Sequence, residues 1–522
     1  MDRKWWTLWA VCTGIFMLLL DLTIVNVALP QIANAFGASI SDLQWVIDAY
    51  ALTLASLLLT SGSLADSFGR RKLFSIGIVA FTLGSLLCGV STGSLFLILA
   101  RGFQGIGGAI MFATSLALLA EAFRGRERGI AFGVFGAVTG IAVAVGPVLG
   151  GLLTSGLSWR WIFLVNLPIG AAALCITLLR VDESRNPRAH RTDWIGFVTF
   201  SGALAALVYG LIESSTSGWG SATVVGSLIT AGLLLVGFVA TELARREPML
   251  DFSLLRKPTF SGGLVAAFGI NGSIFALFTY LILYLQDGLG LSAVATGIRF
   301  LILTGATFVT AAVAGRLTSR VPIKWLIAPG FVLAGIGLLL MGGLTPASSW
   351  SHFIPGFIVS GIGVGLVNVP LASTAVGVVE PARSGMASGI NSTLRQVGTA
   401  TGIAALGSVF TSEVRSSIVS QLRKTPLSAE ASAIASRVTN GKLARPTERR
   451  AAAARIVERA AVGGFAHGLN EILLVGAVVS FVAGALCLGL IRQKDFTAAH
   501  HGEAAEPCRP DEEPAGSRLA SA

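Results

Sequence analysis

Asp21 stands inside a long apolar run, residues 7–29, within the stretch Leu-Asp-Leu-Thr-Ile-Val-Asn-Val-Ala-Leu-Pro that ends at Pro30. A carboxylate at the middle of a membrane costs roughly 2.5–3.5 kcal/mol on insertion scales. We therefore expect Asp21 to titrate or to face a substrate inside a transport pathway. The alternative is an Asp near a helix end that reaches water, and the apolar residues from Val25 to Leu29 weigh against it.

A second pair of polar residues, Arg101 and Gln104, lies in the apolar run 94–118. The two residues are one helical turn apart, and Gly105 and Gly108 share their face, which favours close contact with another helix. At 1.5 Å per residue Asp21 lies ~21 Å and Arg101 ~20 Å from the same membrane surface. The two charges are expected to meet, directly or through Gln104 or water. A purely structural ion pair is the alternative.

Further polar residues occur in other apolar runs. Asp48, near the outer end of the second run, is a second candidate for proton coupling, with solvation at the membrane interface as the alternative. Arg395 lies deeper in its run. The candidates for a substrate cavity are Asn26, Gln104, Asn391 and Arg395.

The connection after the second run reads Gly62-Ser-Leu-Ala-Asp66-Ser-Phe-Gly69-Arg70-Arg71-Lys72. Gly62 permits close helix approach, Gly69 allows a tight turn, and Asp66 can pair with basic groups or with a helix N-terminus. Such a loop can hold two helix bundles together in one state and release them in the other. A role in topology alone would explain Arg70 and Arg71, but it would explain neither Asp66 nor the glycines.

The fifth apolar run, residues 129–153, is rich in glycine. Its members of interest are Gly140, Gly146, Pro147, Gly150 and Gly151. Glycines spaced by four share a helix face and allow tight packing. The Gly146-Pro147 step can bend the helix.

Composition places these residues in a membrane protein. Hydrophobic residues make up 53% of 522 positions and charged residues 12%, with 63 glycines, whereas a soluble domain has about 25% charged residues. The net charge of +11 comes from Lys and Arg between the apolar runs, so we expect no nucleic acid partner. The five cysteines show no metal or disulfide spacing, and no metal site is expected.

The chain contains fourteen apolar runs of roughly spanning length. Lys and Arg gather in every second connection, which predicts that both termini are cytoplasmic. Residues 412–468 are expected to form a long outward loop with an exposed helix at 447–462, and residues 496–522 a disordered cytoplasmic tail. Similar motifs recur in the second half, such as Gly105-Ile-Gly107 and Gly361-Ile-Gly363, which indicates duplicated halves.

On these motifs the chain resembles the major facilitator superfamily, and more narrowly its fourteen-span drug:proton antiporters of the EmrB/QacA type. The stretch 20–30 is the most specific match, and the similarity extends over almost the whole chain. The resemblance implies an all-α polytopic fold with two six-helix bundles, residues 1–192 and 259–495, and a two-helix insert at 193–258. It also implies that Asp66 is a conformational latch, that Arg101 takes part in proton relay, and that the helix with Gly140–Gly151 is pliant. The second-half copy of the loop has Ser319 in place of the acid, so only one latch is clear.

The sequence therefore predicts efflux of lipophilic compounds across a bacterial cytoplasmic membrane. The proton gradient would drive it without a cofactor, and the partners would be the bilayer, protons and small lipophilic substrates, with cationic ones among the candidates. Export of an endogenous metabolite or antibiotic by the same machine is the alternative. A primary pump or membrane enzyme is disfavoured because the chain has no phosphate-binding Gly-x-x-x-x-Gly-Lys stretch, metal cluster or triad. A receptor on a transporter scaffold would be expected to carry a large cytoplasmic domain.

Overall fold

The regular elements of the computed structural model are all helical over the residues that it describes, which are 2–123, 125–184, 193–245, 250, 252–318, 320–379, 384–439 and 451–496. In lipid, a helix satisfies its own backbone hydrogen bonds, which explains this architecture in a chain so rich in apolar residues. The side chains of some helical residues, Asp66 among them, lie outside the described part.

Seven helices form the first part of the molecule. They are α1 (Arg3–Phe36), α2 (Ile40–Phe68), α3 (Arg70–Gly89), α4 (Ser94–Ala122), α5 (Gly125–Gly156), α6 (Trp161–Leu164) and α7 (Asn166–Arg180). The sixth predicted span is thus interrupted at Val165, where α6 gives way to α7. The turn from α1 to α2 is short because Gly37 adopts φ 62° and Ser39 caps α2 in a reciprocal box with Asp42.

The remaining helices follow in chain order. They are α8 (Trp194–Ser217), α9 (Ala222–Ala244), α10 (Pro258–Ile270), α11 (Ala276–Leu283), α12 (Ala293–Leu317), α13 (Lys324–Met341), α14 (Ile354–Val376), α15 (Ser384–Leu422), α16 (Ala431–Thr439) and α17 (Ala451–Leu490). Two π-helical segments, Asn271–Phe275 and Tyr284–Gly288, join α10 to α11 and extend α11. Short 3₁₀ turns occupy Phe252–Arg256, Trp350–Phe353 and Ser428–Glu430.

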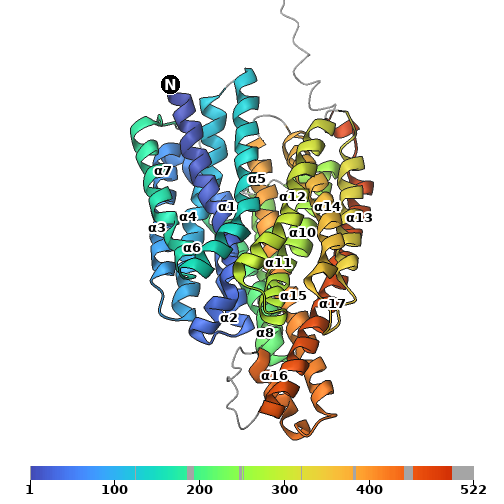
Figure 1. The fold of residues 1–522 in the computed structure, drawn as a ribbon. Coiled ribbons are helices and arrows are strands. Elements are labelled where there is room, and N and C mark those ends of the chain that lie inside the picture. The colour runs from blue at the N-terminus through green and yellow to red at the C-terminus, as the bar shows by residue number, and fades with distance from the viewer. Residues whose placement is uncertain are drawn as a thin grey trace, which may run out of the picture.

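The helices stand side by side in two groups, α1–α7 and α10–α17, as Figure 1 shows. We call the contact between these groups the seam. It is formed by α5 against α12, α2 against α15, and α1 against α11. Helix α8 packs against both α2 and α15, through Leu204, Val208 and Ile212, so the two-helix insert lies along the seam.

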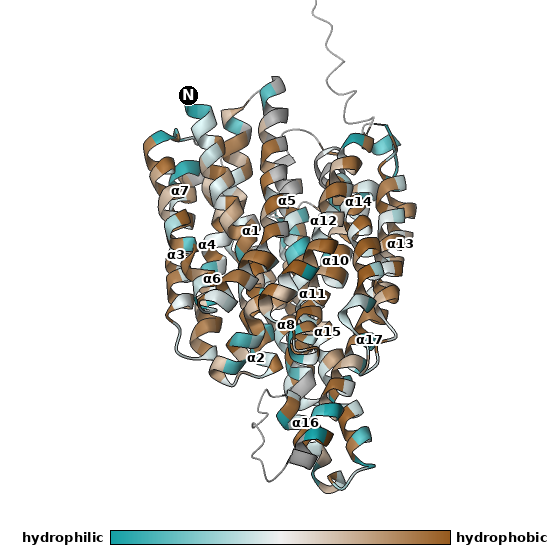
Figure 2. Ribbon diagram, in the orientation of Figure 1, coloured by the Kyte–Doolittle hydropathy of each residue, from teal (hydrophilic) through white to brown (hydrophobic). Residues whose placement is uncertain are grey.

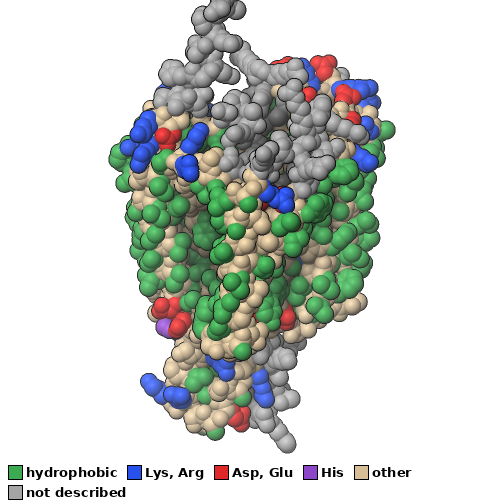
Figure 3. Space-filling model, turned by 180° about the vertical axis from the view of Figure 1, so that it is seen from behind, with side chains coloured by type: hydrophobic (Ala, Val, Ile, Leu, Met, Phe, Trp, Pro, Cys, Tyr) green, Lys and Arg blue, Asp and Glu red, His purple; other side chains and the backbone are tan. Residues whose placement is uncertain are grey.

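The side chains are distributed as a membrane requires. Hydrophobic residues predominate along the helices, and α16 is more polar (Figure 2). Seen from behind, the middle of the molecule is covered by hydrophobic side chains, while Lys and Arg gather toward its two ends (Figure 3). We call these ends the N-terminal end, where α1 begins, and the α16 end.

Twelve helical segments within the described residues are long and apolar enough to cross a membrane. Helices α2 and α15 are not among them, although each has more than enough residues to span. Both lie in the seam with helices on either side, where polar residues need not face lipid. The count of fourteen crossings therefore stays a prediction.

The segment 412–468 differs from the predicted loop. Helix α15 continues to Leu422, and α16 follows. Residues 451–462 of the predicted exposed helix form the first part of α17, which continues through the final span to Leu490, while residues 447–450 lie outside the described part. The apolar residues of α16, Ile434 and Val438 among them, are buried in the main core cluster. Because Ala- and Arg-rich segments support helix as well as apolar ones do, the polarity change did not mark a helix boundary.

Candidate functional site

Five side chains from four helices meet in the middle of the first helix group. Asp21 comes from α1, Arg101 and Gln104 from α4, Ser85 from α3 and Asn166 from α7. Each is buried, with at most 1% of its surface exposed. Burial of this many polar groups is tolerable because they bond to one another.

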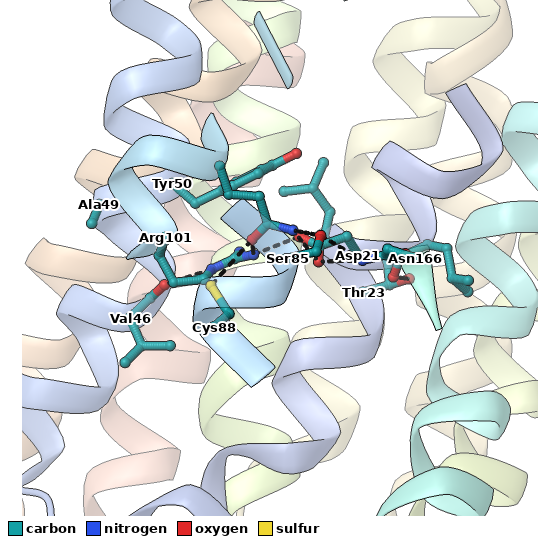
Figure 4. A network of polar contacts seen from close by, with 12 residues as sticks. Asp21, Thr23, Val46, Ala49, Tyr50, Ser85, Cys88, Arg101 and Asn166 are labelled. Carbon is teal, nitrogen blue, oxygen red and sulfur yellow. Dashed lines mark hydrogen bonds and ion pairs between the residues drawn. The ribbon is translucent and has the colours of Figure 1, made fainter. Parts of the chain in front are cut away.

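The centre of this network is an ion pair. Arg101 donates through one terminal nitrogen to Asp21 Oδ2 at 2.5 Å and to Gln104 Oε1 at 2.7 Å. The Gln104 amide donates to Asp21 Oδ1 at 2.9 Å and to Ser85 Oγ at 2.8 Å. Asn166 donates to the same two oxygens, each at 3.2 Å. Figure 4 shows the carboxylate of Asp21 held from both sides by these donors.

Arg101 is fixed on its other sides as well. Its Nε donates to the carbonyl of Val46 on α2 at 3.1 Å, and the guanidinium lies 4.2 Å from the ring centroid of Tyr50. Cys88 Sγ lies 3.6 Å from Gln104 Oε1. Such a buried pair can be no more stable than apolar residues of the same volume, but removal of one partner typically costs 3–5 kcal/mol. A functional role therefore explains the presence of this buried ion pair better than a contribution to stability does.

Glycines let the helices approach closely enough to form the network. A Cβ built on Gly84 of α3 would lie 2.7 Å from the Cα of Gln104, and one built on Gly105 of α4 would lie 2.6 Å from the carbonyl oxygen of Tyr50. Real Cβ contacts are longer than this. The predicted face of Arg101, Gln104 and Gly105 thus contacts α2 and α3 directly.

Asp48 of α2 is fully buried, so the alternative of a solvated interfacial carboxylate is wrong. Neither of its carboxylate oxygens has a hydrogen-bond partner among the described residues. A buried carboxylate without partners is costly when charged. The protonation state of Asp48 therefore decides whether a net charge is buried at this position.

Near Asp48, hydrogen bonds cross the seam. Gln44, one turn before it, donates to the hydroxyl of Tyr280 at 3.0 Å, and Tyr280 donates to the carbonyl of Ile403 at 2.6 Å. A Cβ at Gly407 would overlap both side chains.

Two more bonds join α1 to the second group. Thr279 donates to Asn26 Oδ1 at 3.2 Å, and the amide of Gln286 donates to the carbonyl of Val27 at 2.9 Å. These residues lie in the half of each helix nearer the α16 end. The two helix groups are thus in contact at that end.

Helix α5 lies between α1 and α12. A Cβ at Gly146 would overlap Thr23 of α1, and one at Gly150 would lie 2.9 Å from the carbonyl oxygen of Ile24. On the other side, a Cβ at Gly151 would lie 2.6 Å from the carbonyl oxygen of Ala293, at the start of α12.

The same close approach involves Pro147, whose carbonyl lies against Gly297 of α12. Gly140 is different, since a Cβ there would meet only Phe308 at 3.8 Å. Four of the five predicted residues therefore lie in close contact with a neighbouring helix, and Gly140 does not.

The connection between α2 and α3 is a sharp turn at Gly69, with φ 106°. Glu183, which follows α7, accepts from the backbone N–H groups of Arg71 at 3.0 Å and Lys72 at 3.1 Å. Arg71 also donates to the carbonyl of Leu178 at 2.6 Å. This carboxylate therefore occupies the N-terminus of α3, where negative charge is favoured.

The structure leaves the predicted role of Asp66 in this loop untested and does not support the one predicted for Gly62. Asp66 falls within α2, but its side chain lies outside the described part, so its role as a latch stays a prediction. A Cβ at Gly62 would meet nothing within 4 Å, so close helix approach does not explain this glycine. Arg70 lies 3.5 Å from the carboxylate of Glu121 on α4, within the first helix group.

The predicted cavity residues do not form one lining. Gln104 is buried in the polar network, where it bonds to Arg101, and its place in a substrate cavity stays a prediction. Asn391 is 5% exposed and donates to the carbonyl of Gly263 at 3.5 Å. Asn26 bonds across the seam, and Arg395 of α15 is half-buried. Burial of Gln104 agrees with the glycines on its helix face, since Gly105 and Gly108 both pack closely against Tyr50.

Sequence reasoning missed several residues that the structure brings to the site. Ser85 and Asn166 were not expected beside Asp21, and Tyr280 was not expected beside Gln44. A polar residue inside each apolar run was the available signal for all of them. The sequence signal for Glu183 was an acidic residue directly after an apolar run, but its contact with the turn at Gly69 required the structure.

A model of the Major Facilitator Superfamily matches residues 11–403. This chain belongs to the major facilitator superfamily. As a member of this superfamily, the protein is a transporter and not an enzyme. Among the described residues, no group of three or more His, Cys, Asp or Glu side chains could hold a metal ion.

Curated relatives of the superfamily cover most of the chain. The multidrug resistance protein Stp of Mycobacterium tuberculosis is 36% identical over 77% of this chain and 75% of its own. The puromycin resistance protein pur8 of Streptomyces alboniger is 38% identical over 78% and 82%. The tetracenomycin C resistance and export protein of Streptomyces glaucescens is 35% identical over 79% and 77%.

Solved structures show the same fold at low sequence identity. An inward-facing bacterial homologue of the human lysosomal transporter Spinster aligns with a TM-score of 0.61 at 18% identity, over 95% of this chain and 98% of that one. The human organic anion transporter MFSD10 aligns with a TM-score of 0.58 at 16% identity, over 93% and 100%. At this identity the likeness concerns the fold alone.

Proposed function

We propose that this protein exports small lipophilic toxic compounds, including drugs, in exchange for protons. The superfamily membership and the relatives named for drug resistance and export support efflux. The single observation that supports proton coupling is the buried Asp21–Arg101 pair, because the two charges are costly inside a membrane and stability does not require them.

The pair offers a simple coupling mechanism. In the structure the carboxylate of Asp21 has Arg101 as its charged partner. A rearrangement of α1 against α4 that separates the two would leave a buried charge without this partner, which is costly, and uptake of a proton would remove that charge. Asp48, buried at the seam without a hydrogen-bond partner among the described residues, is the second acid that can accept a proton before substrate leaves.

The seam supplies the conformational change. The contacts between Gln44 and Tyr280 and between Asn26 and Thr279 hold the α16 end together. In the proposed cycle this end opens toward the outside, a proton enters, substrate leaves, and the helix groups rock to the opposite state. The close contact of α5 with α12 through Gly151 and Pro147 would be the pivot between the groups.

The proposed setting is the bacterial cytoplasmic membrane, with fourteen crossings and both termini in the cytoplasm. The positive residues at the N-terminal end, such as Arg3 and Lys4 before the first span, support this orientation. The proton gradient drives the cycle without a cofactor. The partners are the lipid bilayer, protons and small lipophilic substrates, cationic ones among them.

The test is Asp21→Asn in everted membrane vesicles, followed with a pH-sensitive dye and a panel of lipophilic compounds. We expect loss of proton-driven uphill efflux and of substrate-induced proton release, while downhill substrate exchange continues. Asn retains an oxygen that can accept from Gln104 and Asn166 but cannot carry the charge. Full coupling in this variant would remove Asp21 from the proton path and leave Asp48 as the acid.

Two controls separate coupling from folding. Asp182→Asn changes an exposed acid that pairs with Arg3, and we expect it to transport as the parent does. The double variant Asp21→Asn with Arg101→Gln restores neutrality inside the network, so its abundance on an immunoblot should equal that of the parent. Uphill efflux should remain absent from it.

Export of an endogenous antibiotic is the second candidate. The relative from Streptomyces glaucescens is named for export of tetracenomycin C, and one from Streptomyces coelicolor is named a probable actinorhodin transporter. Susceptibility profiling of a deletion strain separates the two functions. Broad sensitivity to unrelated compounds supports drug efflux, and loss of one secreted product supports the alternative.

A further inference from the structure

A cavity of about 660 Å³ lies at the α16 end, apart from the charged network and the seam contacts. The last residues of α8, with the turn after them, form one wall, and one face of α15 forms the other. Two arginines and a row of serines line it, and none of its described lining residues is acidic.

The spacing along α15 builds this wall. Ser408, Ser412, Ser416 and Ser420 follow one another at intervals of four, and Arg415 and Arg423 flank the same face. The row begins inside the protein, because Ser408 is 2% exposed and its hydroxyl lies 2.6 Å from that of Ser214 on α8. It ends at exposed arginines. Hydroxyl groups therefore line this wall from the floor of the cavity to its mouth, beside the apolar side chains of Val419 and Trp219.

The opposite wall turns away at Gly218, whose φ of 80° ends α8. Ser217 is held there by the carboxylate of Glu213, one turn earlier. Trp219 follows, 55% exposed at the rim. Exposed tryptophans are typical of the interface between lipid and water.

The charge of this cavity has no counterpart in the described part of the chain. Neither Arg415 nor Arg423 forms an ion pair with a described acidic side chain. Two guanidinium groups without a described acidic partner lie here beside several hydroxyl donors. Together they match phosphate oxygens, since arginine binds phosphate through two parallel hydrogen bonds.

The size of the cavity and its depth in the membrane indicate which kind of phosphate-bearing molecule it binds. A volume of about 660 Å³ is that of a small-molecule pocket, and it exceeds what one inorganic ion fills. The apolar span of α8 ends at Ser214, so the cavity begins where the apolar part of the helix stops. That is the depth of lipid headgroups, and the membrane supplies them at high local concentration.

We propose that this cavity binds the phosphate-bearing headgroup of an anionic phospholipid, with Arg415 and Arg423 on the phosphate and the α15 serines on the remaining headgroup oxygens. The bound lipid would join α8 of the insert to α15 of the second helix group. The proposal does not depend on which compound the protein exports.

The experiment uses the purified full-length protein and native mass spectrometry with phosphatidylglycerol, cardiolipin and phosphatidylcholine as probes. We expect the parent to retain phosphatidylglycerol or cardiolipin in preference to phosphatidylcholine. The double variant Arg415→Gln with Arg423→Gln should lose that retention about tenfold or more. The matched control, Arg437→Gln with Arg459→Gln, removes two exposed arginines of α16 and α17 outside the cavity and should retain lipid as the parent does.

A second variant distinguishes a loss of lipid binding from misfolding of the arginine variant. Ser412→Trp fills the cavity at an exposed position and leaves both arginines in place, so it should also lose anionic lipid. Equal retention of the two lipid classes by the parent, or unchanged retention in both cavity variants, would overturn the proposal. Displacement of the lipid by inorganic phosphate or glycerol 3-phosphate at micromolar concentration would overturn the lipid assignment and indicate a site for soluble anions.

Discussion

Arg101 shows how much one side chain can organise. It bonds to α1 through Asp21, to α2 through the carbonyl of Val46 and to its own helix through Gln104. A lysine keeps the charge but has a single nitrogen, so it cannot reproduce bonds that leave a planar fork in different directions. The function of this position therefore depends on shape as well as on charge.

We predict that Arg101→Lys lowers proton-coupled efflux at least tenfold, because loss of even one charge-assisted bond costs about 1.5–3 kcal/mol. Substrate-induced proton release in vesicles measures this. Arg437→Lys, at an exposed arginine of α16, is the control and should transport normally. Parental coupling in the Arg101→Lys protein would show that the site requires only a positive charge.

At this scale the sequence predicted part of the site. The contact of Asp21 with Arg101 could be expected because both depths follow from helix rise. Asn166 and Ser85 could not be placed beside them, since this requires the rotation of α3 and α7 about their axes. That rotation depends on glycine contacts such as Gly84 against Gln104, which no single helix reveals.

Among the elements, α3 begins in an unusual way. Its N-terminus is preceded by Gly69 in a conformation that side chains rarely adopt, and it is occupied by Glu183 from after α7. A Cβ at Gly69 would lie 2.7 Å from Glu183 Oε1. The turn and the carboxylate therefore constrain each other.

We predict that Gly69→Ala lowers the free energy of unfolding by about 1–3 kcal/mol, because the backbone is strained there for any residue with a Cβ. Gly62→Ala is the matched control in the same loop motif. Its Cβ meets nothing within 4 Å in a helical segment, and alanine favours helix, so stability should be equal or higher. Thermal unfolding of the two purified variants in one detergent measures the difference, and equal melting temperatures would contradict the assignment.

The whole molecule is held at the α16 end by bonds across the seam. Asn26 and Thr279, 3.2 Å apart through their side-chain oxygens, lie on α1 and on α11 of the opposite group. If this end must open during transport, a covalent link between the two positions should stop the cycle. Neither position needs to bind substrate for this to hold.

We predict that Asn26→Cys with Thr279→Cys, in a chain without its five native cysteines, loses transport when a short thiol-specific cross-linker is added. A reducible cross-linker should allow recovery on addition of a reductant. Each single variant treated in the same way is the control. Continued transport by cross-linked protein would show that these helices do not separate.

Topology is tested by thiol labelling. We predict that a cysteine at Ser428, in the turn before α16, is labelled from outside intact cells. One at Ser517, beyond the described residues, should react only after permeabilisation. Exterior labelling of Ser517 would contradict the predicted count of fourteen crossings.

The fold as a whole was largely predictable, since apolar runs and motif spacing indicated two helix groups with an insert. The region near α16 was not. Residues from Ser412 to Gly468 read as a loop because their polarity differs from a span, yet α15 extends into the segment as far as Leu422 and α17 begins within it at Ala451. Hydropathy records the solvent around a helix and not where the helix ends, and the apolar contacts of Ile434 and Val438 that hold the segment in place come from distant parts of the chain.

The length of α15 has a mechanical consequence. Its 39 residues form a rod of ~58 Å, longer than the hydrocarbon thickness of a bilayer. A tilt of about 10° around its middle would move its far end by roughly 5 Å. Helix α16 is attached to that end and would be displaced with it. A dye placed there would report each swing of the second helix group in real time, without touching the parts that carry protons or substrate.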